Sequence, residues 1–309
     1  MGIVVIGAAF VDIKGFPDDI YLPTGRNVGK VEYIHGGVAR NVAEDIANME
    51  LRPTYVGIVD DTPMGDDVLR KLKNHKVNTD YVLTRPDGMG LWLAVFDHTG
   101  DVAGSISKRP DLMPLLDLLE NKGDEIFQQA DSVVFEVDIN KEIVKKIFEL
   151  AEKYQTKTYA LVSNMSIAIE RRDFLRRLDC FICNRQEAGM LFLDDYEHKS
   201  VEEMREILVD KVGRAEIPSM VVTLGGDGAV FADSDGSGGW CPARKVQVKD
   251  TTGAGDAFCA GVVSSLTYGK TLAEAVDVGS ILAAAVITSS ENVCPRFQPA
   301  ELGFAEPEE

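Results

Sequence analysis

The feature of this 309-residue chain that most constrains its fold is the alternation of short apolar runs with longer amphipathic stretches. The apolar runs, which we expect to be strands, are 3–6, 55–59, 133–135, 159–162, 180–183, 220–223 and 229–231. Stretches with helical periodicity lie between them, at 38–50, 63–75, 141–154, 199–212, 254–267 and 272–289. Apolar strands separated by helices indicate a parallel sheet that is buried on both faces. The sequence therefore predicts an α/β fold whose ligands bind beyond the carboxyl ends of the strands.

Two segments, 13–35 and 87–109, interrupt this alternation because neither has a convincing helical pattern. The second is expected to be a hairpin that turns at residues 97–101. Together the two segments are expected to form a small sheet that projects from the α/β body as a lid. Since no linker or internal repeat divides the chain, residues 1–309 are expected to be a single domain.

The charge and the apolar content argue against several partners and locations. The chain has 32 Lys and Arg against 50 Asp and Glu, a net charge of −18, which argues against binding nucleic acid or an anionic membrane. No apolar run approaches the roughly 20 residues that span a bilayer, and residues 1–7 lack the basic start of a signal peptide. We therefore expect a cytoplasmic protein.

The five cysteines do not suggest a disulfide framework or a metal site. Cys180 and Cys183 form a C-x-x-C, but they lie in an expected strand, where residues three apart point to opposite faces. We expect both to be buried structural residues.

The segment with the most chemical content runs from Asp250 to Asp256. Gly253, Ala254 and Gly255 lie where the helical pattern 254–267 begins, so several backbone N–H groups and the helix dipole would point at one spot. Such an anion hole suits a transferring phosphoryl group. Asp256, in the first turn, would lie beside the attacking hydroxyl. Spacing alone supports an ordinary capped helix start equally well.

A second glycine pair, Gly36 and Gly37, precedes the helical pattern 38–50. Asn41 falls on the polar side of that helix, and its amide can both donate and accept hydrogen bonds, which suits a polyol. Asp12 follows the first strand at the expected ligand-facing edge of the sheet. In isolation, a polar helix start and a turn aspartate are the more common explanations.

Two further motifs follow predicted strands. Thr223, Gly225 and Gly228 mark a strand that ends in a tight glycine turn, which without other context is simply a hairpin. Asn184 and Glu187 follow the strand 180–183. A carboxylate at this position could orient the water shell of Mg²⁺, although an N-cap with an acidic first turn explains the same spelling.

Taken together, these stretches resemble the ribokinase-like, or PfkB, family of carbohydrate kinases over essentially the whole chain. Residues 250–261 look like the C-terminal signature of that family, and residues 36–43 look like the N-terminal one. The resemblance implies a three-layer α/β/α sandwich with a mostly parallel central sheet and a small β lid. It also implies ATP and Mg²⁺ as cofactors and a homodimer that forms through the lid.

The resemblance assigns roles to the motifs already described. Asp256 would be the general base, and Gly253, Ala254 and Gly255 would form the anion hole. The acceptor would contact Asp12, Gly36, Gly37 and Asn41, and the nucleotide would contact Asn184, Glu187, Thr223, Gly225 and Gly228. Glu187 would hold Mg²⁺ through water, and Asp250 is a candidate ligand for K⁺.

The acceptor is less well defined by the sequence. The spelling of residues 36–41 and of the hairpin 96–101 is most similar to the pseudouridine kinase branch, which implies transfer to the 5′-hydroxyl of pseudouridine or a related nucleoside. Trp92 in the lid could stack on a base, although packing is the more common role of such a residue. Ser163 and Asn292 depart from the residues usual in the family near the active site, and so does Cys183, which precedes Asn184. These departures leave the acceptor open.

Three alternatives remain at this point. The chain could phosphorylate ribose or another free sugar, or it could be a silent family member that binds a nucleoside or sugar as a sensor. The intact Asp256 favours an enzyme, because a sensor has no need of a base. A Rossmann dehydrogenase is disfavoured because residues 7–12 lack the G-x-G-x-x-G motif.

Overall fold

The computed structural model describes residues 2–99 and 101–304. Within them, a nine-stranded sheet has the order β13-β12-β11-β10-β9-β8-β1-β4-β5. Its strands are β1 (Ile3–Ile6), β4 (Thr54–Val59), β5 (Val82–Thr84), β8 (Ser132–Glu136), β9 (Lys157–Leu161), β10 (Cys180–Asn184), β11 (Ser219–Thr223), β12 (Ala229–Asp233) and β13 (Gly238–Cys241). All neighbours run parallel except β12, which is antiparallel to both β11 and β13. The predicted mostly parallel α/β sheet is confirmed.

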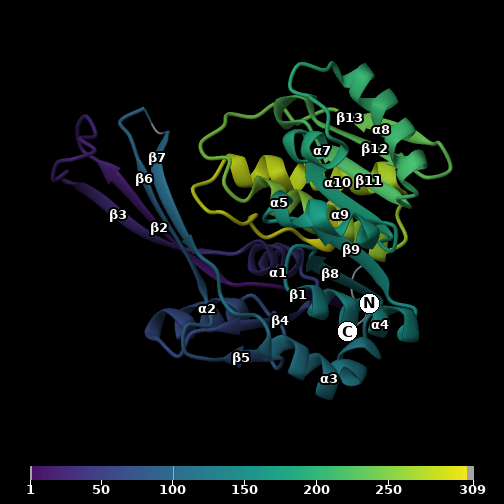
Figure 1. Ribbon diagram of the computed structural model, residues 1–309, viewed down its shortest axis with the longest axis horizontal. Helices are drawn as coiled ribbons and strands as arrows, with labels where there is room; N and C mark the ends of the chain where they lie inside the picture. The colour runs from purple at the N-terminus through teal and green to yellow at the C-terminus, as the bar shows by residue number, and fades with distance from the viewer. Residues whose placement is uncertain (1, 100, 305–309) are drawn as a thin grey trace.

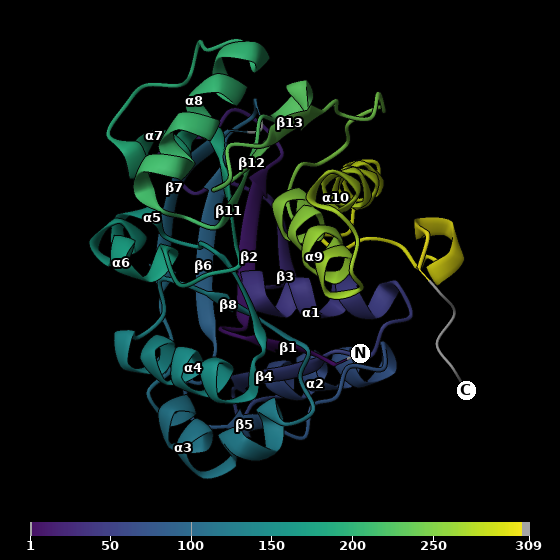
Figure 2. The same ribbon diagram turned by 90° about the vertical axis from the view of Figure 1, so that its right-hand side faces the viewer.

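Helices cover both faces of this sheet, which completes the predicted three-layer sandwich (Figure 2). One face carries α3 (Pro114–Phe127), α4 (Lys141–Tyr154), α5 (Met165–Ala168), α6 (Arg172–Leu175), α7 (Arg185–Phe192) and α8 (Val201–Ala215). The other face carries α1 (Val38–Asn48), α2 (Pro63–Asn74), α9 (Ala254–Thr267) and α10 (Leu272–Ile287). Short 3-10 turns lie at Ile169–Arg171, Gly225–Asp227 and Pro299–Leu302.

Side-chain alternation along the strands divides the core in two. In β1, Val4 and Ile6 pack into the cluster under α3 and α4, whereas Ile3 and Val5 pack into the cluster under α1 and α9. In β10, Cys183 belongs to the first cluster and Cys180 to the second, and both thiols are free. The two cysteines therefore point to opposite faces of the sheet, as their spacing predicts.

The lid is a separate four-stranded sheet with the order β3-β2-β6-β7. Its strands, β2 (Phe10–Pro17), β3 (Gly29–Gly36), β6 (Gly90–Phe96) and β7 (Val102–Lys108), project from the body in Figure 1. β6 and β7 form the predicted antiparallel hairpin, although Gly100 of its turn lies outside the described residues. β2 begins at Phe10, before the expected boundary at residue 13. Only residues 7–9 separate it from β1.

Several short or uncapped elements were not anticipated from the sequence. They are α3, α5, α6, α7, β5 and β13. α3 has no side-chain cap and contains Gly123, whose missing side chain makes room for Leu150: a Cβ there would lie 2.5 Å from Leu150 Cδ1. Of the helices in the described part of the chain, none is long and apolar enough to cross a bilayer.

Candidate active site

The predicted anion hole, Gly253 to Gly255, lies at the N-terminus of α9. Gly253 is the N-cap residue, with φ of 80°, and a Cβ on it would lie 2.0 Å from the carbonyl oxygen of Asn292. Only glycine therefore fits this position. The N–H of Ala257 donates to Gly253 O over 3.0 Å, while the N–H groups of Gly255 and Asp256 have no partner within residues 2–99 and 101–304. These free donors face outward at the positive end of the helix dipole, as an anion site requires.

Asp256, in the first turn of α9, has the environment of a general base. Asn41 Nδ2 donates to Asp256 Oδ2 over 2.6 Å, which joins two residues 215 positions apart. Burial raises the pKa of Asp256 to about 6, and the negative charges of Asp12 and Glu187 add to the rise, while the Asn41 hydrogen bond and the charge of Arg40 oppose it. A carboxylate with this pKa is ionised at neutral pH and still accepts a proton readily.

Glycines at the end of β3 allow Asp12 and α1 to come together. A Cβ on Gly36 would lie 2.6 Å from Asp12 Oδ1, so the carboxylate of Asp12 fits only against a glycine. Gly37 has φ of 93°, and a Cβ on it would lie 2.6 Å from Ala8 O. Burial raises the pKa of Asp12, and the charges of Lys14 and Arg40 oppose that rise. The predicted acceptor residues thus lie together on one side of Asp256.

Arg40, which the sequence argument did not single out, fixes the orientation of Asn41. Its guanidinium is 1% exposed and donates to Glu44, to the carbonyl oxygens of Gly36 and His35, and to Asn41 Oδ1. Because Asn41 Oδ1 accepts from Arg40, Asn41 Nδ2 remains to donate to Asp256. The location of Arg40 next to Asn41 in the first signature was a usable signal.

Asn292 joins the anion hole to the acceptor side. Its Nδ2 donates to His35 O over 2.6 Å and contacts Asn41 Oδ1 at 3.3 Å, while its own carbonyl lies against Gly253. In the sequence, Asn292 is evident only as a departure from the residue usual in the family. Its contacts, which span 251 and 257 positions, could not be read from local sequence.

A cavity of about 1020 Å³ opens beside the anion hole. Thr223, Gly225 and Gly228 line it together with Thr251, Ala254 and Gly255. The glycine turn after β11 and the start of α9, which are far apart in sequence, therefore border the same space. Its size is at the upper end of the range for small-molecule sites and suits a nucleotide.

Asn184 and Glu187 form a capping box at the start of α7. Asn184 Oδ1 accepts from the N–H of Glu187 over 2.9 Å, and Glu187 Oε2 accepts from the N–H of Asn184 over 2.7 Å. The N-cap interpretation therefore describes the local geometry. Burial raises the pKa of Glu187, and the charge of Asp138 adds to the rise. The charge of the same carboxylate adds to the raised pKa of Asp256, so Glu187 acts on the first turn of α9.

The residues present fit a hydrated divalent cation better than a metal bound directly by the protein. In the described ranges, no group of three or more His, Cys, Asp or Glu side chains is placed to hold a metal ion. Mg²⁺ usually keeps several waters and binds through one or two carboxylates plus substrate phosphates. Glu187 can supply such a carboxylate, whereas both oxygens of Asp138 already accept hydrogen bonds from Ser163 and Arg109. Asp250 Oδ1 accepts from the N–H of Thr252 over 2.8 Å, beside the anion hole.

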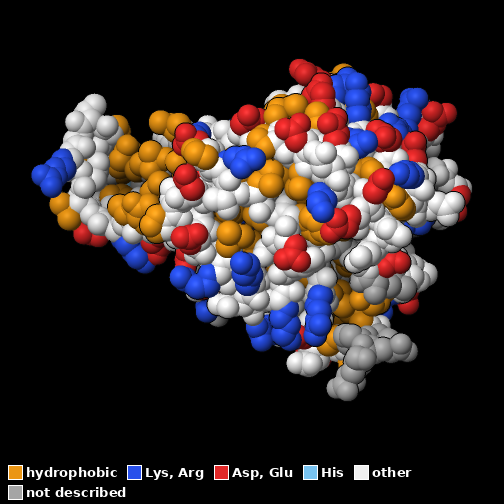
Figure 3. Space-filling model, turned by 90° about the horizontal axis from the view of Figure 1, so that it is seen from below, with side chains coloured by type: hydrophobic (Ala, Val, Ile, Leu, Met, Phe, Trp, Pro, Cys, Tyr) orange, Lys and Arg blue, Asp and Glu red, His pale blue; other side chains and the backbone are white. Residues whose placement is uncertain are grey.

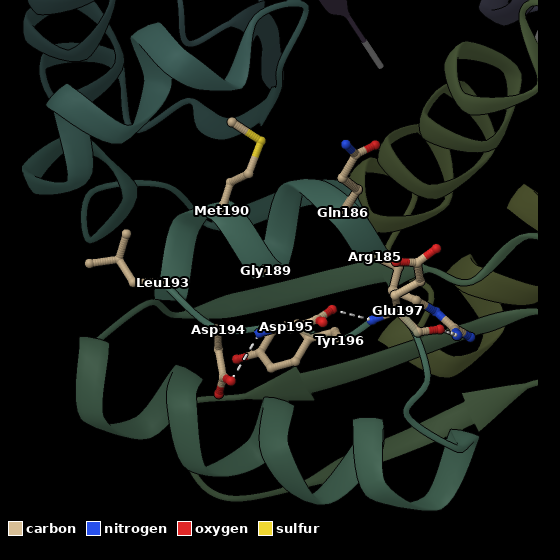
Figure 4. A pocket seen from close by; sticks show the side chains of 9 residues that line it. All are labelled: Arg185, Gln186, Gly189, Met190, Leu193, Asp194, Asp195, Tyr196 and Glu197. Atoms are coloured by element: carbon tan, nitrogen blue, oxygen red, sulfur yellow. Dashed lines mark hydrogen bonds between the residues drawn. The ribbon is translucent and has the colours of Figure 1, made fainter.

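A second hollow lies beside α7, and its side chains do not converge on one point as those around Asp256 do. It has a volume of about 760 Å³ and is lined by Arg185, Gln186, Gly189, Met190 and residues 193–197. Figure 4 shows Gln186 and Met190 pointing away from Asp194 and Tyr196, so the side chains do not converge. Arg185 is occupied by the carbonyl of Glu197 and by Asp227.

Comparison with known proteins agrees with this geometry. Residues 2–294 match the family described as pfkB family carbohydrate kinase. The chain is 34% identical over 292 residues to a guanosine-inosine kinase of Exiguobacterium acetylicum, covering 94% of this chain and 95% of that protein. It is 26% identical over 277 residues to the pseudouridine kinase of Escherichia coli (strain K12), covering 89% and 86%.

The fold is shared with solved ribokinase structures. The structure of Arabidopsis thaliana ribokinase complexed with ribose and ATP has a TM-score of 0.83 at 20% identity, covering 98% of this chain and 99% of that one. Ribokinase from Giardia lamblia has a TM-score of 0.83 at 19% identity, covering 97% and 98%.

Proposed function

Because the chain belongs to the pfkB family of carbohydrate kinases and is an ATP-dependent sugar or nucleoside kinase, we propose that its acceptor is the 5′-hydroxyl of a nucleoside. The observation that carries the nucleoside is the pairing of Trp92 with Asp12. They are register partners in the parallel strands β6 and β2, so both side chains project from the same lid face. An aromatic face beside a carboxylate can stack on a base, typically for about 1–3 kcal/mol, while the carboxylate binds ribose hydroxyls.

Guanosine and inosine are the first candidates, because the relative with 34% identity over nearly the full chain is a guanosine-inosine kinase. Pseudouridine is the second candidate. It is supported by the 26% identical pseudouridine kinase and by the spelling of residues 36–41. Both share the ribose that Asp12 and Asn41 would contact, and they differ in the base that would meet Trp92.

The residues of the site divide the work of an in-line transfer. Asp256 removes the proton from the acceptor hydroxyl while that oxygen forms a bond to the γ-phosphorus and the bond to the leaving ADP oxygen breaks. The N–H groups of Gly255 and Asp256 stabilise the charge on the transferring group. Asn41 holds the Asp256 carboxylate, and Gly253 lets the start of α9 lie against the backbone of Asn292. MgATP supplies the phosphoryl group and the charge of the metal; kinases of this family use both ATP and Mg²⁺.

The cation roles extend the same proposal. Glu187 would orient Mg²⁺ through water, beside the nucleotide contacts Asn184, Thr223, Gly225 and Gly228. Asp250 would bind K⁺ next to the anion hole. Its carboxylate already orders the loop through the N–H of Thr252, and a bound cation would reinforce that order.

The test is ADP release from MgATP with guanosine, inosine, pseudouridine, uridine, adenosine, ribose and several hexoses, with and without K⁺. Turnover of guanosine or inosine above all others is the expected result. Preference for free ribose or a hexose would contradict the nucleoside. If no acceptor is turned over, a melting shift with one of them and no ADP release would indicate a sensor.

We propose that the outer face of the lid joins two copies of the chain. Tyr33, Leu93 and Ile106 align across the sheet with Ile13 and are 62%, 43% and 71% exposed. Figure 3 shows apolar side chains gathered on the lid side of the molecule. Exposed apolar rows of this kind usually mark interfaces. Tyr33→Asp should convert the dimer to a monomer in sedimentation analysis. A wild-type monomer would contradict the proposal.

A further inference from the structure

A buried lysine in the lid has no close ion pair: its charge acts on Asp12 and Asp250, but in the described part of the chain it forms no salt bridge with either. Lys14, in β2, is 4% exposed, and the one hydrogen bond of its ammonium group to a described residue is a 3.5 Å contact from Nζ to Thr252 Oγ1. Among residues 2–99 and 101–304, no carboxylate oxygen lies within 4.0 Å of Nζ. Burying a cation without a partner costs several kcal/mol. A buried charge at this cost indicates that Lys14 has a functional role.

The position of Lys14 shows where that charge acts. Lys14 lies two residues after Asp12, so both project from the same face of β2. Thr252, which the ammonium contacts, precedes Gly253 and the free N–H groups of Gly255 and Asp256. The ammonium therefore faces the anion hole from the lid side, while the N-terminus of α9 faces it from the body.

We propose that Lys14 is a catalytic residue whose ammonium donates hydrogen bonds to the transferring phosphoryl group, on the side opposite the α9 N-terminus. The inference rests on the phosphoryl transfer proposed for this site. Lys14 neither gains nor loses a proton. The acceptor proton still passes to Asp256, one P–O bond forms and one breaks, and Lys14 offsets the charge on the equatorial oxygens. A three-donor ammonium with only a long bond to Thr252 has donors to spare.

The arrangement makes the lid part of the catalytic apparatus and not only a cover. Asp12 and Lys14 lie on the same strand, so a lid that is placed to bind the acceptor also brings the cation to the phosphoryl group. Chemistry would then be fast only when the acceptor is bound, which limits wasteful transfer to water.

The experiment compares Lys14→Met, Lys14→Gln and Lys14→Arg with the control Lys30→Met. Lys30 lies in the neighbouring lid strand β3 and its side chain is 70% exposed. We expect Lys14→Met and Lys14→Gln to lower kcat by about 10²–10³-fold, the usual effect of losing one such donor, while the Kd for MgADP stays within about threefold. Lys14→Arg should recover part of kcat, and Lys30→Met should match the wild type.

A binding readout separates catalysis from structure. In wild-type protein, aluminium fluoride, which mimics the transferring phosphoryl group, should raise the Tm further in the presence of MgADP. That additional rise should be absent in Lys14→Met and Lys14→Gln. A lysine with a purely structural role would instead lower the Tm of both ligand-free variants, whereas removal of a buried cation that forms no salt bridge should leave the Tm unchanged or higher.

Two results would overturn the inference: a kcat within threefold of wild type in Lys14→Gln, or an unchanged fluoride-dependent rise in Tm. The fluoride measurement needs no acceptor. If the wild type turns over no nucleoside, the proposed acceptor fails, and the melting shifts still decide the role of Lys14.

Discussion

The two sheets of the molecule obey opposite rules of burial. In the nine-stranded sheet, β1 and β8 are buried along their whole length, and Val5 and Val134 are 0% exposed. In the four-stranded lid, every residue of β7 is exposed. The first sheet separates two apolar cores. The second has one face on the active site and the other toward solvent, and this difference explains what each sheet contributes.

The lid also departs from the usual pattern of a half-exposed sheet. Its inner face carries Asp12 and Lys14 beside Trp92, while its outer face carries the apolar residues Tyr33 and Ile106. A sheet normally places apolar side chains inward and polar ones outward. The inner face also carries Phe16 and Phe96, which stack on each other, so both faces hold apolar side chains. Charged residues on the inner face suit the proposed polar acceptor, and exposed apolar residues on the outer face suit the proposed contact with a second copy. In the proposed mechanism, the body supplies stability and the general base, and the lid supplies the acceptor contacts and Lys14.

The sharpest test of the body's role is Asp256→Asn. Asparagine keeps the size of the side chain and removes the base, so kcat should fall by at least about 10²-fold, while the Kd for MgADP stays nearly unchanged. ADP release and calorimetric titration measure the two quantities. An Asp256→Asn variant that retains activity would show that Asp256 is not the general base. The body would then not supply the catalytic proton acceptor that distinguishes it from the lid.

Matched isoleucine truncations test the difference in burial directly. Ile6, in β1, is 0% exposed and Ile106, in β7, is 71% exposed. Ile6→Ala should lower the free energy of unfolding by about 2–5 kcal/mol because it leaves a cavity, and Ile106→Ala should change it by less than about 0.5 kcal/mol in the monomer. Urea denaturation in the Tyr33→Asp background keeps the lid exposed. Equal losses would show that the lid is part of the cooperative core.

The pH dependence of kcat/KM is the smallest expected effect. Burial raises the pKa of Asp256 to about 6, and the base acts only when it is ionised. The rate should therefore be level above about pH 7 and fall tenfold per unit well below pH 6. Since the charge of Asp12 adds to the raised pKa, Asp12→Asn should move the midpoint to lower pH. An unchanged midpoint in Asp12→Asn would show that the lid carboxylate does not influence the pKa of Asp256.

The sequence predicted the buried body of the molecule more accurately than its lid. The strand 3–6 and the helices 141–154 and 254–267 were predicted with their observed bounds, because continuous burial and helical spacing leave a clear pattern. α7 and β5 were missed because elements of eight and three residues carry too few periods to recognise. The start of β2 was misplaced because lid strands mix polar and apolar residues on both faces.

The site was predictable where one segment held the chemistry. Asp256 and the glycines before it lie within a single motif, whereas the role of Asn41 was predicted only from the family resemblance, because its own helix fits a polar helix start as well. Asn292 was noted only as a departure from the usual residue, because its role lies in contacts between distant segments, such as the 3.3 Å contact with Asn41. Arg40 was missed although its contacts, to Gly36, Glu44 and Asn41, are local. Lys14 did have a local signal, since in a strand it shares a face with Asp12. Its burial, however, is a property of the folded chain.

The single residue between β3 and α1 has a mechanical consequence. β3 ends at Gly36 and α1 begins at Val38, so Gly37 alone connects a lid strand to the helix that carries Asn41. A one-residue connection cannot absorb movement, so a rotation of the lid must shift the first turn of α1 as well. Exchange of lids between related kinases should therefore succeed only when the transplanted piece includes the Gly36–Gly37 joint and keeps its length.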